Sequence, residues 1–228
     1  MKKHALAALA WFLVIASIVL FGGSDDALGT EIANDSSSSF SPPTQATKYR
    51  RTLMREVRRY HGLKPTYALH AAIIHQESSW RPDAESPVGA QGLAQFMPAT
   101  AEWMPEIDTN IGSVDPFNPK WSIRAMASYT SWLLQRVDAA DFCNQNAKML
   151  SAYNGGIGWI SRDEDLADKK GYNSGTWFGN VENYSERADW AFDENRHYVR
   201  RIALDLQMNY KNTKFNAPGG VITCQQEL

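Results

Sequence analysis

One glutamate draws attention because an apolar stretch of the chain leads directly to it. Residues 71–80 read AAIIHQESSW, so four apolar residues are followed three positions later by Glu77. Burial beside such a stretch disfavours the charged carboxylate and raises its pKa. A carboxylic acid that stays protonated near neutral pH can donate a proton to a leaving oxygen. Most glutamates at helix ends are simply solvated or paired, so this hypothesis needs support from other parts of the sequence.

The element that must position Glu77 is a helix predicted from about Thr66 to Ser78. Its apolar residues lie on most sides, which is typical of a helix buried in the core. Pro82 ends the helix because it disfavours helical geometry at Arg81. Glu77 is therefore expected in the last turn of a central helix, where its side chain can face a cleft.

Hydrophobic periodicity predicts a mainly α domain with little β structure. Further helices are expected at 47–64, near Pro98, and at about 119–137, 144–153 and 188–209. Residues 82–101 are rich in glycine and proline and are expected to form a loop or short hairpin. The polar, weakly patterned segment 161–186 is predicted to be a long insertion or a lid-like loop.

The beginning of the chain has the composition of an export signal. Two lysines after Met1 precede a long uncharged, apolar stretch. Residues 1–24 are predicted to be a signal peptide or a signal anchor, with the retained anchor preferred. A serine run and a proline pair predict a flexible polar linker at 25–46, followed by a domain at 47–212 and a C-terminal tail at 213–228. The protein is therefore expected to be exported.

The composition argues against some classes of function. A net charge of -2 and a pI of about 6.2 give no broad cationic surface, which disfavours nucleic-acid binding. The histidines are scattered without paired-ligand spacing, so no metal site is expected. In an oxidising compartment Cys143 and Cys224 either form a disulfide or remain two free thiols, and the sequence leaves both open. The eight tryptophans suit a sugar-binding cleft, although large aromatic residues usually serve the core.

From Glu77 onward the sequence carries ordered blocks that resemble a known family. They are Glu77-Ser78, SPVGA at 86–90, GL at 92–93, QFMP at 95–98, AYNGG at 152–156 and Glu-x-Arg-x-Tyr-Val at 194–199. These blocks are similar to the signature of the bacterial lytic transglycosylases of the soluble SLT type, glycoside hydrolase family 23. The resemblance spans roughly residues 55–208. It implies a lysozyme-like (SLT) helical domain with little β structure, here preceded by an N-terminal hydrophobic helix.

The resemblance also implies roles for individual residues. Glu77 would be the single catalytic acid and base. Six residues would bind the substrate. Ser86, Gln95 and Met97 would line the muramic-acid subsite, and Tyr153 would lie beside the carboxylate. Tyr198 would close the pocket and Asn154 would bound the floor of the cleft. Elementary chemistry agrees, because a hydroxyl at Ser86 can bond an acetamido group and Tyr153 can hold the carboxylate in place.

Two departures from the family pattern are visible. Family members commonly carry methionine between the positions of Leu93 and Gln95, where this chain has Ala94, so one apolar contact to the substrate is in doubt. The interval from Asn154 to Tyr198 is also long for the family. The segment 161–186 is therefore expected to shape substrate preference.

The reaction implied by the resemblance is cleavage of the β-1,4 bond between N-acetylmuramic acid and N-acetylglucosamine in peptidoglycan. Its product would be a 1,6-anhydro-muramic acid end, and no cofactor would be required. The expected partners are peptidoglycan glycan strands and, through the N-terminal segment, a membrane. We expect a monomer that binds no nucleic acid and is periplasmic or membrane-anchored, facing the cell wall.

Two other functions stay open at this point. A hydrolytic lysozyme of the goose type would position a water molecule with Asp83, Glu85 or Asp115. A glycan-binding or assembly protein would have kept the fold and lost catalysis, although the retention of Glu77 argues against it. The biological setting is equally open between phage lysis, wall housekeeping and a secretion machine.

Overall fold

The computed structural model describes residues 40–63, 65–216 and 221–224. Within these residues the chain is mainly helical, as predicted, and β pairing consists of isolated bridges from Gln91 to Glu85 and to Phe96. The α-helices are α1 (Thr44–His61), α2 (Tyr67–Ser78), α3 (Pro98–Ile107), α4 (Pro119–Leu134), α5 (Phe142–Gly155), α6 (Gly158–Lys169), α7 (Asp189–Arg200) and α8 (Gln207–Lys211). A 3-10 turn, η1 (Val181–Asn183), precedes α7, and a π-helical stretch, η2 (Arg201–Leu206), follows it.

The predicted N-terminal hydrophobic helix at 1–24 lies outside the described residues. Where the structure is described, no helix is both long enough and apolar enough to cross a membrane. α1 begins at Thr44, directly after Pro43, and so starts inside the range predicted to be a linker, 25–46.

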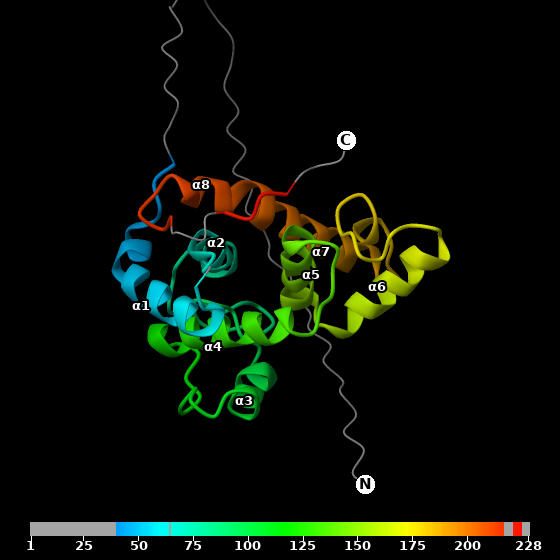
Figure 1. Cartoon of the computed structure of the whole chain (residues 1–228). Helices are drawn as coiled ribbons and strands as arrows, with labels where there is room; N and C mark the ends of the chain where they lie inside the picture. Colours follow the sequence, from blue (N-terminus) through cyan, green and yellow to red (C-terminus); the bar gives the residue numbers. More distant parts are fainter. Residues whose placement is uncertain (1–39, 64, 217–220, 225–228) are drawn as a thin grey trace, which may run out of the picture.

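α2 occupies the centre of the fold, with α1, α4 and α8 arranged around it (Figure 1). Its residues from Tyr67 to Ile74 are all buried, because apolar side chains face every side of the helix. The helix packs against α1, η2 and α8. This burial is the packing expected of the apolar stretch in the sequence.

α2 ends abruptly, and a buried tryptophan anchors its end. Ser79 adopts the left-handed conformation, with φ of 51°, and its backbone N–H returns to the carbonyl four residues earlier at 2.9 Å. The next residue, Trp80, is fully buried, and its Nε1 donates to the hydroxyl of Tyr210 on α8 at 2.7 Å. The last turn of α2, which carries the candidate acid, is thereby held in one place.

α4 and α5 each begin at a capping side chain. The Oδ1 atom of Asn118 accepts the backbone N–H groups of Lys120 at 3.0 Å and Trp121 at 3.4 Å. The carboxylate of Asp141 accepts the backbone N–H of Asn144 at 2.8 Å. α4 packs against both α1 and α5, and Figure 1 shows α5 meeting one end of α4. These caps fix where the two helices start, and hence which residues they bring to the centre.

The last helical segment runs without a break from Asp189 to Lys211, close to the helix predicted at 188–209. In its final part the side chain of Gln207 pairs with the backbone of Ile222. Nε2 donates to the carbonyl at 2.9 Å, and Oε1 accepts the N–H at 3.1 Å. The C-terminal residues 221–224 are therefore held against this helix.

Cys143 and Cys224 form a disulfide, with their Cα atoms 5.3 Å apart. Of the two alternatives that the sequence left open, the structure contains the bonded pair. The bond joins the first turn of α5 to the C-terminal segment.

The segment 161–186 is not a continuous loop, contrary to the prediction. Its first part belongs to α6, and η1 adds a short turn before α7. The inward face of α6 carries Ile160, Asp163 and Ala167, all of them buried. Because the middle position of this face is a carboxylate, the apolar periodicity that would have predicted a helix is interrupted.

A buried ion network holds α6 in place. Asp163 accepts hydrogen bonds from Arg196 at 3.0 Å, from Arg187 at 3.4 Å and from Ser185 at 2.7 Å. Arg196 also donates to the carbonyl of Glu182 at 2.8 Å. These bonds fasten α6 and η1 to α7, so this part of the segment is a fixed element rather than a lid.

Candidate active site

Glu77 lies in the last turn of α2, and its side chain is half-buried. The hydroxyl of Tyr198 donates a hydrogen bond to its Oε1 atom at 2.6 Å. Burial of the carboxyl group raises the pKa of Glu77 to about 8; the bond from Tyr198 lowers this pKa, and the nearby charge of Glu194 raises it. Although part of the side chain reaches solvent, protein surrounds the carboxyl group closely enough for burial to dominate. The apolar stretch thus has the effect on Glu77 expected from the sequence.

Two tyrosines flank the carboxyl group from different helices. Tyr198 of α7 is 4% exposed, and Tyr153 lies near the end of α5 and is half-buried. Burial, and then the charge of Glu77, raise the pKa of both phenols well above the ordinary value. Both hydroxyls therefore stay protonated. Tyr153 was expected to hold the carboxylate, but its hydroxyl donates to the carbonyl of Ala94 at 2.9 Å instead. The hydrogen bond to the carboxylate comes from Tyr198.

A second carboxylate, Glu194, lies near Glu77 and sits one helical turn before Tyr198 on α7. Asn154 donates to it through a long hydrogen bond of 3.5 Å and accepts one from Asn195 at 2.8 Å. Burial raises the pKa of Glu194, and the bond from Asn154 lowers it. Glu194 is not among the site residues predicted from the sequence. Its four-residue spacing from Tyr198, which puts both on one helix face, is the signal that could have identified it.

The loop that follows α2 is tied to the end of that helix. The hydroxyl of Ser78 donates to the carbonyl of Leu93 at 2.8 Å. Gly92 has φ of 74° and lies against Pro116, whose carbonyl oxygen would stand 1.8 Å from a Cβ atom at this position. A side chain at Gly92 is therefore excluded, both by the backbone conformation and by the close approach of the two segments.

Three predicted subsite residues lie on this loop and its end, namely Ser86, Gln95 and Met97. Ser86 accepts the backbone N–H of Ala90 at 2.9 Å, which leaves its hydroxyl proton available to a ligand. Gln95 is buried with φ of 49°, and its amide nitrogen donates to two carbonyls of the same loop, at 3.1 and 2.9 Å. The structure thus gives Gln95 a role in holding the loop, whereas half-buried Met97 remains accessible.

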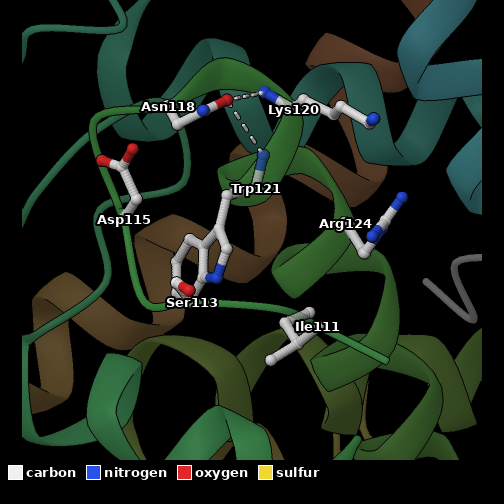
Figure 2. Close-up of a pocket in the computed structure, with 7 residues that line it drawn as sticks. All are labelled: Ile111, Ser113, Asp115, Asn118, Lys120, Trp121 and Arg124. Carbon is white, nitrogen blue, oxygen red and sulfur yellow. Dashed lines mark hydrogen bonds between the residues drawn. The ribbon is translucent and has the colours of Figure 1, made fainter. Parts of the chain in front are cut away.

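A cavity of about 270 Å³ opens at the start of α4, and Glu77 is not among the residues that line it (Figure 2). Its lining residues are Ile111, Ser113, Asp115, Asn118, Lys120, Trp121 and Arg124. Of the carboxylates considered for a hydrolytic reaction, Asp115 lies here, and Asp83 and Glu85 are exposed. The hydrogen bond and the nearby charge that affect Glu77 come from Tyr198 and Glu194 on α7. We therefore define the site by Glu77 and these partners, and not by the cavity.

The chemistry available at this site is proton transfer. Glu77 is protonated at neutral pH because its pKa is about 8, and its position allows it to give that proton to an oxygen atom. Once charged, the carboxylate keeps the hydrogen bond from Tyr198 and can take up a proton again. Among residues 40–63, 65–216 and 221–224, no group of three or more His, Cys, Asp or Glu side chains is placed to hold a metal ion.

Comparison with known proteins shows similarity over the part of the chain that carries Glu77 and Tyr153. The transglycosylase SLT domain matches residues 59–176. The chain is 33% identical over 114 residues to membrane-bound lytic murein transglycosylase F of Pasteurella multocida, covering 49% of this chain and 21% of that protein. It is 31% identical over 153 residues to the soluble lytic murein transglycosylase of Escherichia coli K12, covering 64% of this chain and 20% of that protein.

A solved structure shows the same fold. It is the X-ray structure of an inactive mutant of the lytic transglycosylase Slt from Pseudomonas aeruginosa, in which glutamine replaces a glutamate. The TM-score is 0.54 at 27% identity, and the match covers 75% of this chain and 25% of that one. The chain therefore spans about a fifth to a quarter of the length of these proteins. Because the domain match covers more than half of it, the chain belongs to the transglycosylase SLT domain family.

Proposed function

We propose that this chain is a lytic transglycosylase that cleaves the β-1,4 bond between N-acetylmuramic acid and N-acetylglucosamine in peptidoglycan. The observation that carries the proposal is Glu77, a carboxyl group with a pKa of about 8 at the end of a buried helix. The substrate class is supported by the names of the relatives, which are lytic murein transglycosylases.

In the first step Glu77 donates its proton to the glycosidic oxygen as the bond to C1 of the muramic acid breaks. The 2-acetamido group of the same sugar stabilises the positive charge at C1, as in other substrate-assisted glycosidases. Ser86 has a free hydroxyl proton with which to bind such a group. Tyr198 stabilises the carboxylate that forms, because its raised pKa keeps its own proton in place.

In the second step the Glu77 carboxylate removes the proton of the C6 hydroxyl of the muramic acid. The C6 oxygen attacks the positively charged C1 and closes a 1,6-anhydro ring, which discharges the cation that the acetamido group had stabilised. The proton taken up by Glu77 restores the acid form. The reaction uses one carboxyl group in both steps, consumes no water and requires no cofactor.

Hydrolysis is the second candidate, because Glu194 places another carboxylate near Glu77. Hydrolytic glycosidases commonly use a second carboxylate, in the inverting class to activate a water molecule. Glu194 is less suited to act as that base, since Asn154 occupies one of its oxygens and burial favours its neutral form. The two reactions differ in product, so they can be separated directly.

The test is product analysis after digestion of purified peptidoglycan sacculi. Transglycosylation gives muropeptides that are one water molecule lighter than the reducing ends released by hydrolysis. Glu77→Gln should lower the rate by at least about 100-fold, because the general acid is lost. The matched control is Glu102→Gln, which changes an exposed glutamate on α3 and should leave the rate unchanged. Reducing ends alone, or full activity in Glu77→Gln, would overturn the proposal.

We also propose that the catalytic domain, predicted at 47–212, acts outside the cytoplasm and faces the cell wall. The names of the related enzymes, membrane-bound or soluble lytic murein transglycosylase, support a location in the cell envelope. When spheroplasts that express the full chain are treated with protease, this domain should be degraded, or it should already be present in the medium. A domain that stays protected inside intact spheroplasts would contradict the proposal.

A further inference from the structure

A group of aromatic side chains lies on α3 and α4, beyond the residues that flank Glu77. The rings of Trp103 and Trp132 meet edge to face, with centroids 5.1 Å apart. Tyr129 stacks with Trp132 at 6.0 Å and meets Trp103 at 6.4 Å. All three side chains are half-buried, so part of each remains open to solvent.

This aromatic group is continuous with the candidate active site. The ring of Tyr129 lies 5.6 Å from the ring of Tyr153, which is close enough to Glu77 to be affected by its charge. Two ring-to-ring steps, each comparable to the width of one sugar ring, therefore lead from Tyr153 to Trp132. A glycan strand with its scissile bond at Glu77 must extend away from the site, and this path offers it an aromatic wall.

Arg136 adds a positive charge at the outer end of the path. Its guanidinium carbon lies 3.8 Å from the centroid of the Trp132 ring, and its Nη1 donates to the carbonyl of Trp132 at 2.9 Å. Stacking and this bond hold the planar group in one orientation. The side chain is exposed, and none of the ion pairs among the described residues involves it. Its remaining N–H groups are therefore free to bind a carboxylate, a geometry that suits arginine.

We propose that Trp103, Trp132 and Arg136 form an outer subsite that binds a muramic acid residue through its carboxylate. Packing accounts for the two tryptophans, and the bond to the carbonyl of Trp132 accounts for the orientation of Arg136; together they present a fixed, exposed guanidinium beside two partly exposed rings. The carboxylate comes either from the lactyl group of a muramic acid without peptide or from the stem peptide attached to it. The inference rests on the proposed function, because it assumes that a peptidoglycan strand occupies the site.

The test measures binding in the Glu77→Gln background, so that no substrate is consumed. The probes are peptide-bearing glycan strands, strands stripped of their peptides by an amidase, and neutral oligomers of N-acetylglucosamine. Arg136→Gln should weaken binding of at least one acidic probe by about threefold to tenfold and leave the neutral oligomer unchanged. The matched control is Arg59→Gln on α1, which removes another arginine placed over an aromatic ring, 5.6 Å from the centroid of Tyr60.

The two acidic probes identify the source of the carboxylate. Loss of affinity with stripped strands points to the lactyl group, and loss with intact strands alone points to the stem peptide. Equal affinity of Arg136→Gln for every probe, or an equal loss on the neutral oligomer, would overturn the inference. These outcomes do not depend on the proposed reaction, which the cleavage products of the wild-type chain test separately. Thermal unfolding of each variant checks that the fold is intact, and Arg136→Lys, which keeps the charge without the planar fork, should retain only part of the affinity.

Discussion

Replacing Tyr198 by phenylalanine should move the alkaline limit of activity to higher pH. The hydroxyl of Tyr198 stabilises the charged form of Glu77 and so lowers its pKa, against the larger effect of burial. Because the first step needs protonated Glu77, the wild-type rate should fall as the pH rises through about 8. Without the hydrogen bond the carboxyl group holds its proton more tightly, and the fall occurs later.

The size of the shift follows from the geometry of this bond. A hydrogen bond to a charged group contributes about 1.5 to 3 kcal/mol, and one pKa unit corresponds to about 1.4 kcal/mol. The alkaline limit should therefore rise by about one to two pH units in Tyr198→Phe. The same bond stabilises the carboxylate that forms when the proton leaves, so kcat should also fall, by about 10- to 100-fold.

The assay is kcat/KM on soluble peptidoglycan fragments, measured from acid to strongly alkaline pH. Tyr153→Phe is the matched control, because this tyrosine also lies beside Glu77 but donates its hydrogen bond to Ala94. Whatever its effect on the rate, Tyr153→Phe should leave the alkaline limit where it is in the wild type. An unmoved limit in Tyr198→Phe would refute the reasoning. A shift of the same size in both variants would show that the polarity of the cleft, rather than this bond, sets the pKa.

Three further predictions concern the stability of the fold. Asp163→Asn leaves two buried arginines without their carboxylate, so the free energy of unfolding in urea should fall by about 3 kcal/mol; a change below about 1 kcal/mol would contradict the role of this network. Burial lowers the pKa of His61 to about 4, whereas a histidine in the unfolded chain has a pKa of about 6.5. As the pH is lowered, the unfolded state therefore takes up the proton before the folded state does, and the free energy of unfolding falls from about pH 6.5 to about pH 4. His61→Gln should show a shallower fall, by up to about 3 kcal/mol over that interval, and identical pH dependence would count against a buried neutral imidazole. Cys143→Ser removes a cross-link between residues 81 positions apart and should cost about 4 kcal/mol; a reducing agent should destabilise the wild type similarly, and a variant of unchanged stability would refute this.

The helix that carries Glu77 could be predicted because its determinants are local. An apolar stretch and a nearby proline are enough to indicate a buried helix that ends close to the carboxylate. The structure adds the left-handed Ser79 and the anchored Trp80, which complete the stop. Both depend on partners in the folded core, and the sequence does not display those partners.

α6 could not be predicted because its determinants are distant. Asp163 occupies an inward position that normally holds an apolar residue, and its partners Arg187 and Arg196 lie 24 and 33 residues further along the chain. For the same reason the sequence did not reveal which of the two tyrosines, Tyr153 or Tyr198, bonds to Glu77. Tyr198 meets Glu77 across 121 residues, and which hydroxyl reaches the carboxyl group depends on how the helical segment that carries Tyr198 packs against α2 through η2 and α8.

The disulfide also determines how the chain responds to cleavage by proteases. Cys143 and Cys224 enclose most of α5 and all of α6, α7 and α8, and with them Tyr198, whereas Glu77 lies outside the enclosed stretch. The turn after α6, around Lys170, is exposed and is the kind of site at which proteases cut. A chain cut there would remain one covalent molecule, with the two sides of its site still joined, until a reducing agent released the fragment. The disulfide would therefore keep the site assembled after a single cut in this turn.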